Sequence, residues 1–150
     1  MNVVVQRVSK ASVTVEGEQI SKIDQGLLVL LGIAGDDKPE DIVWLTKKIA
    51  NLRIFDDENG VMNRSLIDIG GDAIVVSQFT LLASTKKGNR PSYIKAARPE
   101  TAIPIYNEFI KQFENLLNKK VGTGIFGADM KVELLNDGPV TILIDTQSKQ

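Results

Sequence analysis

One uninterrupted apolar run, residues 27 to 33 (LLVLLGI), constrains the fold of this 150-residue chain more than any other feature. Glycines at positions 26 and 35 bound the run, which is far too short to cross a membrane as a helix. A short apolar run between glycines is typical of a strand that is buried on both faces. A second strand, the most apolar of the chain, is predicted at residues 73 to 83 (AIVVSQFTLLA).

An amphipathic helix is predicted after each of these two strands. Pro39 follows two aspartates and opens a pattern with apolar residues at positions 42, 45, 49 and 52. A second helix is expected between residues 99 and 119, and Pro104 either starts it or bends it. The remaining predicted strands are residues 3–8, 12–16, 19–23, 53–55, 130–135 and 140–145, the last two forming a hairpin. The pattern predicts a single α/β domain spanning residues 1–150, with two main helices.

Two absences in the composition exclude most familiar hydrolase mechanisms. The chain has no histidine, so no Ser-His-Asp or Cys-His relay can form. It has no cysteine, so disulfides, thiolate nucleophiles and zinc–thiolate sites are excluded as well. We therefore expect neither a metal nor a cofactor.

The charge balance and the first residues limit the choice of partners. With 18 basic and 19 acidic residues the net charge is −1, which argues against a general polyanion binder but allows a local basic patch. The segment MNVVVQRVSK lacks the long apolar core of a signal peptide. We expect a soluble, cytoplasmic protein with no membrane partner.

Polar residues interrupt the apolar strand predicted at residues 73 to 83. Alternation places Gln78 and Thr80 on one face and Ser77 on the other, so polar groups occur on both faces at the same level. One interpretation is a strand end, where burial gives way to solvent. The other is a strand end that lines a pocket and offers its backbone N–H groups as an oxyanion hole.

Two further segments each allow an ordinary and a functional interpretation. Residues 136–142 (NDGPVTI) are typical of a hairpin turn, and an X–Pro bond is cis in only about 5–6% of folded cases. Residues 84–98 contain five basic and no acidic side chains, which suits either a solvated loop or a patch that contacts phosphates. These five are Lys86, Lys87, Arg90, Lys95 and Arg98.

Two weaker patterns are interpreted without a ligand. Residues 56–59 (DDEN) resemble a cation loop, but the glutamate spacing of an EF-hand is missing, so a turn is predicted. Gly122, Gly124 and Gly127 have the spacing of a dinucleotide fingerprint, yet they precede a predicted strand instead of opening a helix. We interpret that spacing as coincidental.

Several of these segments together resemble the D-aminoacyl-tRNA deacylases, the D-tyrosyl-tRNA deacylase family. The similarity runs from residue 1 to about residue 145 and keeps the segments in the family's order. It is carried by SQFTL at 77–81, NDGPVTI at 136–142, KGNRPSY at 87–93, LRIFDDENGVMN at 52–63 and VVVQRVSKASV at 3–13.

The resemblance implies a compact three-layer α/β/β domain that forms an obligatory homodimer. It implies hydrolysis of the ester that joins a D-amino acid, or mischarged glycine, to the terminal ribose of tRNA, with rejection of L-aminoacyl-tRNA. Such an activity is a chiral proofreading step in translation. The resemblance also implies a cis Gly138–Pro139 bond whose carbonyls reach into the neighbouring subunit's active site, and Arg7 as a residue that helps to hold this motif.

The same resemblance implies that the ribose 2′-OH assists the attacking water, which would make a histidine unnecessary. On that reading the backbone N–H groups near Phe79 and Thr80 hold the ester carbonyl oxygen, and Ser77 and Gln78 shape the pocket. From the charge pattern we infer that Lys86, Lys87 and Arg90 contact phosphates of the acceptor stem. Two alternatives stay open: an esterase that uses Thr80 as its nucleophile, and a non-catalytic tRNA-binding dimer.

Overall fold

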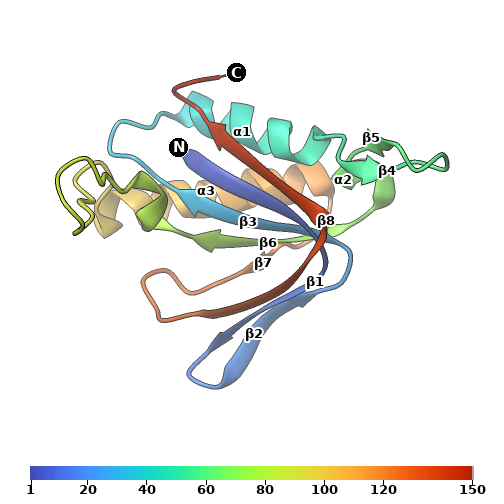
Figure 1. Ribbon diagram of the computed structural model, residues 1–150, viewed down its shortest axis with the longest axis horizontal. Coiled ribbons are helices and arrows are strands. Elements are labelled where there is room, and N and C mark those ends of the chain that lie inside the picture. The colour runs from blue at the N-terminus through green and yellow to red at the C-terminus, as the bar shows by residue number, and fades with distance from the viewer. Residues whose placement is uncertain (150) are drawn as a thin grey trace.

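A computed structural model describes residues 1–149 of the chain (Figure 1). Within these residues the chain forms eight strands, three α-helices and one 3₁₀ helix. In chain order they are β1 (Asn2–Val15), β2 (Glu18–Ile23), β3 (Gly26–Gly32), α1 (Pro39–Asn51), β4 (Phe55–Asp56), β5 (Met62–Arg64), α2 (Leu66–Ile69), β6 (Asp72–Ser77), η1 (Phe79–Leu82), α3 (Pro99–Leu117), β7 (Gly122–Thr123) and β8 (Lys131–Asp145). None of the described helices is long and apolar enough to cross a bilayer.

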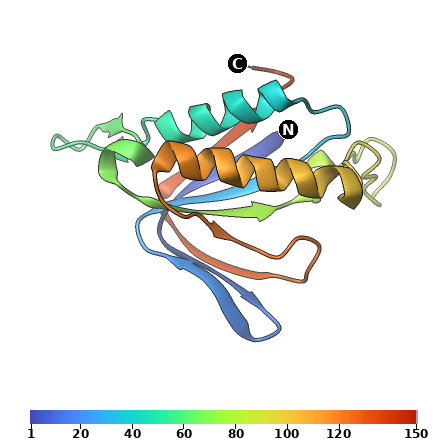
Figure 2. The ribbon, with the colours of Figure 1, turned by 180° about the vertical axis from the view of Figure 1, so that it is seen from behind.

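Three layers make up the molecule. Helices α1 and α3 lie side by side on one face of the main sheet, as both views show (Figures 1 and 2). That sheet has the order β2-β1-β3-β6-β7, and β8 pairs antiparallel with β1 along almost its whole length. The long strands β1 and β8 bend where their register shifts, and their far halves fold away with β2 to form the second β layer. The predicted three-layer α/β/β architecture is confirmed.

Two hydrophobic cores lie between the layers, and β3 contributes to both. Leu27, Val29 and Leu31 point into the core beneath the helices. Leu28, on the alternate face, belongs to the second core between the β layers. Because successive side chains of a strand point to opposite faces, a strand between two cores is apolar at every position. The prediction that this run is buried on both faces is confirmed.

Two predictions about strands are wrong in detail, and one alternative for a helix is ruled out. Residues 131–145 form one continuous strand and no hairpin, because β1 pairs with both halves of it. The Asn-Asp-Gly-Pro sequence therefore forms the irregular bend of β8, where the register shifts by local bulging instead of reversing the chain. The strands predicted at residues 3–8 and 12–16 likewise form a single strand, β1, which ends at Val15. The helix predicted between residues 99 and 119 is confirmed as α3, and it starts at Pro99, so the alternative that Pro104 starts it is ruled out.

The strand predicted at residues 73–83 ends at Ser77, and the chain then turns through η1. This turn fits closely against the end of the parallel neighbour β3. A Cβ atom on Gly32 would lie 2.5 Å from Leu82 Cδ2 and 3.0 Å from the carbonyl oxygen of Gln78. Only a glycine at position 32 therefore lets η1 pack where it does.

Candidate active site

A cavity of about 240 Å³ lies at the carboxyl ends of the parallel strands β3 and β6. Ligand sites in open α/β sheets commonly occupy this edge. The cavity is lined by Leu31, Ile33, Val76, Ser77, Gln78, Phe79, Ala97, Ala102, Phe126, Gly127, Ala128, Asp129, Met130 and Val132. The structure thus brings Ser77, Gln78 and Phe79 together at one wall, whereas Thr80 is exposed and is not part of the lining.

The turn after β6 leaves main-chain donors near this wall. Gln78 N donates to the carbonyl of Leu31 at 2.8 Å, which fixes the turn to β3. The turn's own hydrogen bonding begins with Leu81 N, which donates to the carbonyl of Gln78 at 3.2 Å. The N–H groups of Phe79 and Thr80 precede it, and the first N–H groups of a helix have no partner inside that helix. They are the donors that an oxyanion would need.

Side-chain contacts also order this turn. The Gln78 amide donates from Nε2 to Thr80 Oγ1, so the hydroxyl of Thr80 is held by its neighbour within the SQFTL segment. Among the residues that line the cavity, the one ionisable side chain is the carboxylate of Asp129, which also pairs with Lys131 at 3.1 Å. No lysine belongs to the described lining, so the cavity itself offers no amine base to Thr80.

The wall opposite Gln78 comes from the loop between β7 and β8, which sequence reasoning missed. Phe126 and Met130 line the cavity from this loop. The signal was present in Gly122, Gly124 and Gly127. As predicted, these glycines open no helix, but a Cβ on Gly124 would lie 2.3 Å from Met130 Sδ, so the absence of a side chain at Gly124 makes room for Met130.

Tyr106 of α3 supports the same wall from below. Its ring packs edge-on against Phe126, with 6.2 Å between ring centroids. Its hydroxyl donates to the carbonyl of Val75 at 2.6 Å. Burial raises the pKa of Tyr106 to about 12. The phenol therefore stays protonated at neutral pH and acts as a structural donor, not as a base.

Gly138 and Pro139 lie at the bend of β8, away from this cavity. Both residues are exposed, the peptide bond between them is cis, and neither belongs to the cavity lining. Arg7 is next to them: its Nε donates to the carbonyl of Asp137 at 2.9 Å and its Nη1 donates to the carbonyl of Ile54 at 2.7 Å. The structure therefore joins Arg7 to the Gly138–Pro139 segment but separates that segment from the Ser77–Phe79 wall of the same chain.

The basic segment, residues 84–98, forms an ordered loop between η1 and α3. Ser84 and Ser92 exchange main-chain hydrogen bonds of 2.8 and 2.9 Å across its base. Tyr93 packs edge-on against Phe79, with 5.0 Å between ring centroids. Lys86, Lys87 and Arg90 are exposed at the outer end and take no part in the cavity.

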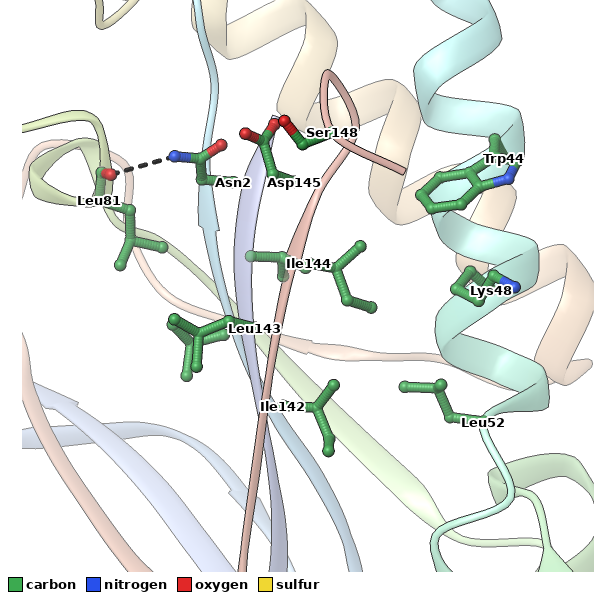
Figure 3. Close-up of a pocket in the computed structure, with 12 residues that line it drawn as sticks. Asn2, Trp44, Lys48, Leu52, Leu81, Ile142, Leu143, Ile144, Asp145 and Ser148 are labelled. Atoms are coloured by element: carbon green, nitrogen blue, oxygen red, sulfur yellow. Dashed lines mark hydrogen bonds between the residues drawn. The ribbon is translucent and has the colours of Figure 1, made fainter. Parts of the chain in front are cut away.

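A larger groove of about 480 Å³ follows the β8 edge of the sheet (Figure 3). Trp44 and Lys48 of α1, with Leu52 just after that helix, lie on one side of the strand, and Leu81 and Leu143 lie on the other. Both Lys48 and Lys149 place their ammonium groups within 5.5 Å of the Trp44 ring centroid. Although this groove exceeds the cavity beside Gln78 in size, it gathers none of the residues that the sequence singles out.

Comparison with known proteins identifies the family. A sequence model of the family described as D-Tyr-tRNA(Tyr) deacylase matches residues 4–145. The chain belongs to the D-aminoacyl-tRNA deacylase family. Curated D-aminoacyl-tRNA deacylases of Bacteroides thetaiotaomicron and Parabacteroides distasonis are 64% and 65% identical to it, over 100% of both chains in each case. The resemblance inferred from the sequence and the assignment to the hydrolases are thereby confirmed.

Solved structures agree with this deacylase fold. A structure described as a c-Myc DNA unwinding element binding protein is 44% identical, with a TM-score of 0.92 over 97% of this chain and 98% of that chain. A structure described as a probable eukaryotic D-amino acid tRNA deacylase has a TM-score of 0.82 over 95% of this chain and 97% of that chain. At 15% identity the second likeness concerns the fold alone.

Proposed function

We propose that this chain hydrolyses the ester of D-aminoacyl-tRNA, and of glycine mischarged on tRNA, while leaving L-aminoacyl-tRNA intact. The observation that carries the proposal is the cavity at the end of β6, where Ser77, Gln78 and Phe79 meet beside free main-chain donors. The mostly apolar lining of the cavity suits the base of the terminal adenosine, and the main-chain donors suit the ester carbonyl. Membership in the family supplies the class of ester.

The proposed chemistry uses the protein for positioning and electrostatic stabilisation. The N–H groups of Phe79 and Thr80 bind the ester carbonyl oxygen and stabilise the negative charge that forms on it. Water, assisted by the ribose 2′-OH, attacks the carbonyl carbon. The bond from that carbon to the ribose oxygen breaks, a proton from water passes to that oxygen, and free amino acid and tRNA leave. Aminoacyl esters are activated, so alignment of the ester supplies much of the acceleration.

The active unit in this proposal is a homodimer. Leu143 of β8 is 76% exposed, and Val4 is its partner across the β1–β8 pair. Leu30 is the next residue in the same row, opposite Val4 on β3. Val4 and Leu143 lie outside both cores, so this row forms an apolar stripe on the face opposite the helices. A second copy on this face would cover the stripe.

Dimerisation also gives Gly138 and Pro139 a role that they do not have within one chain. Both are exposed and separate from their own cavity, so they are free to close the cavity of a second copy. We place the main chain of these two residues where an L side chain would point. A D side chain would point away from them, and glycine has no side chain to exclude. Selection then arises from steric rejection of the L ester instead of tighter binding of the D ester.

The test is hydrolysis of D-Tyr-tRNA, L-Tyr-tRNA and Gly-tRNA by the unmodified protein. Loss of the D and glycine esters with survival of the L ester is expected. Comparable cleavage of the L ester would contradict the chiral selection, and survival of all three esters would favour the non-catalytic tRNA-binding alternative. Sedimentation of the same preparation should give twice the chain mass, and a monomer that cleaves the D ester selectively would contradict the shared site.

A further inference from the structure

Tyr93 and Ile94 form an exposed apolar pair beside the cavity. Ile94 is 89% exposed and Tyr93 is 39% exposed. A single exposed hydrophobic residue needs no explanation. Tyr93, however, meets the ring of Phe79 edge-on, with 5.0 Å between ring centroids, and Phe79 itself lines the cavity; Ile94 is the next residue along the chain. Apolar contact therefore extends from the cavity lining through Phe79 to Tyr93, and the exposed Ile94 follows directly in the chain.

Hydrogen bonds before and after this apolar pair in the chain hold it in place. Ser92, the residue before it, exchanges two main-chain hydrogen bonds with Ser84. Ala96 N donates to the carbonyl of Tyr93 at 3.0 Å and closes a turn with Ile94 at its tip. Ala97 N then donates to the carbonyl of Ile33 at 2.9 Å, which ties the turn to the end of β3. The exposure of Ile94 is thus built into an ordered turn.

The charged residues of the loop that carries this apolar pair are all basic. Lys95 is the next residue and Arg98 follows, while Lys86, Lys87 and Arg90 lie on the other arm of the loop. None of these five cations forms an ion pair with a residue of the described chain. An ordered apolar pair among unpaired cations fits a partner that combines flat apolar faces with an anionic backbone. Single-stranded nucleic acid has this combination, because its bases stack and its phosphates are anionic.

We propose that Phe79, Tyr93 and Ile94 form a platform for the unpaired nucleotides that precede the terminal adenosine of tRNA. This rests on the proposed function, because the aminoacylated adenosine must occupy the cavity for the preceding nucleotides to cross Phe79. Their bases lie on the three side chains, and their phosphates face Lys95 and Arg98. Stacking does not distinguish bases strongly, so the platform accepts tRNAs of different sequence.

The experiment compares three substrates that differ only in how much RNA they carry: D-Tyr-adenosine, D-Tyr-CCA trinucleotide and D-Tyr-tRNA. The test variant is Ile94→Ser, which removes an exposed side chain and so leaves the packing intact. The matched control is Val61→Ser, since Val61 is 57% exposed but lies in the turn between β4 and β5. Tyr93→Phe keeps the stacking surface, and Tyr93→Ser removes it.

Ile94→Ser and Tyr93→Ser are expected to raise KM for the trinucleotide and the tRNA by roughly three- to tenfold, with kcat unchanged. KM for D-Tyr-adenosine should stay within twofold, and Tyr93→Phe and Val61→Ser should match the unmodified protein on all three substrates. Equal losses on the adenosine ester, losses on tRNA but not on the trinucleotide, or no loss at all would each overturn the platform. If the unmodified protein leaves D-Tyr-tRNA intact, the proposed function itself fails.

Discussion

Arg7 Nε donates a hydrogen bond to the main-chain carbonyl of Asp137, 2.9 Å away and 130 residues later in the chain. The same guanidinium donates from Nη1 to the carbonyl of Ile54 at 2.7 Å. Arg7 is a buried side chain. One buried cation therefore joins β1, the segment before β4 and the bend of β8 that carries Gly138. Its planar, forked donors can serve carbonyls in two directions, which a lysine cannot do in the same way.

Replacing Arg7 with alanine should loosen this bend. The carbonyls of Asp137 and Ile54 would lose their charged donor, so the free energy of unfolding should fall by about 2 kcal/mol. In the proposed function kcat/KM for D-Tyr-tRNA should fall as well, because the bend is no longer fixed. Urea denaturation and single-turnover hydrolysis measure the two effects. Arg7→Lys should fall between the parent and alanine, and the exposed Lys10→Ala on the same strand serves as the control. An Arg7→Ala protein within 0.5 kcal/mol of the parent would contradict this account.

Gly138→Ala should lower activity on the D ester without creating activity on the L ester. Gly138 has a φ of +129°, and an added Cβ would lie 2.9 Å from both Arg7 Nη2 and Val140 Cγ2. The bend must shift to admit it, and in the proposed dimer that shift crowds the cavity of the partner subunit. Gly60→Ala is the matched control, because Gly60 also has a positive φ (+74°) but has open space around it. If Gly138→Ala hydrolysed L-Tyr-tRNA, steric rejection by this segment would be wrong in its simple form.

The sequence predicts best those elements whose burial requires an apolar residue at every position. β3 is apolar at successive positions because it lies between two cores, and this pattern can be interpreted without knowing its neighbours. The bend of β8 shows the limit of such reasoning. Asn-Asp-Gly-Pro favours a chain reversal locally, and only the pairing of β1 with residues on both sides of it shows that the strand continues.

The candidate site was predictable on one wall only. Ser77, Gln78 and Phe79 are consecutive and out of character for an apolar strand, so the sequence marks them. The opposite wall, from Phe126 to Met130, comes from a loop about fifty residues later, and its place depends on how β7 joins β6. The turn at η1 likewise depends on the contact with Gly32, which the parallel register of β3 and β6 creates.

Acid should weaken the turn between β4 and β5 through Asp57. Main-chain hydrogen bonds from Val61 and then from Asn59 hold the pKa of Asp57 below its usual value. A folded-state pKa below the unfolded one contributes stability that is present above the unfolded pKa and is lost as pH falls through the folded pKa. In Asp57→Asn the urea midpoint should therefore decline less steeply below about pH 4 than in the parent.

The control for the acid effect is Glu58→Gln in the same turn. The described structure records no hydrogen bond to the Glu58 carboxylate, so this variant should keep the parent's acid dependence. Identical slopes for Asp57→Asn and the parent would show that the main-chain bonds at Asp57 do not couple to global unfolding.

The outer basic residues should contribute to tRNA binding and not to cleavage of the ester. Replacing Lys86, Lys87 and Arg90 together with alanine should raise KM for D-Tyr-tRNA and flatten the dependence of KM on salt, because fewer phosphate contacts release fewer counterions. All three are exposed and outside the cavity, so cleavage of D-Tyr-adenosine should hardly change. Lys10, Lys22 and Lys47, which are exposed and lie outside both the loop and the cavity lining, provide a charge-matched triple control. Equal losses on both substrates would mean that the loop shapes the active site.

The last prediction separates the two catalytic mechanisms that the sequence leaves open. Thr80 Oγ1 already accepts a hydrogen bond from Gln78, and no lysine or arginine belongs to the described cavity lining. A threonine without a base is a weak nucleophile. Thr80→Ala should therefore retain activity within about threefold, which is less than 1 kcal/mol of transition-state stabilisation. In contrast, a D-Tyr-tRNA that ends in 2′-deoxyadenosine should be hydrolysed poorly by the unmodified protein, because the hydroxyl that assists water is missing.

Rapid quenching of the reaction gives the complementary measurement, since a covalent mechanism must pass through a tyrosyl ester on Thr80. Thr80→Ser keeps a hydroxyl in the same turn, so an acyl-enzyme mechanism predicts that serine preserves activity and alanine abolishes it. The RNA-assisted mechanism predicts instead that the two variants behave alike, because the main-chain N–H at position 80 survives both substitutions. An acyl group trapped on Thr80 would assign the first step of the reaction to that residue, and full activity on the deoxy substrate would falsify the assistance by the ribose.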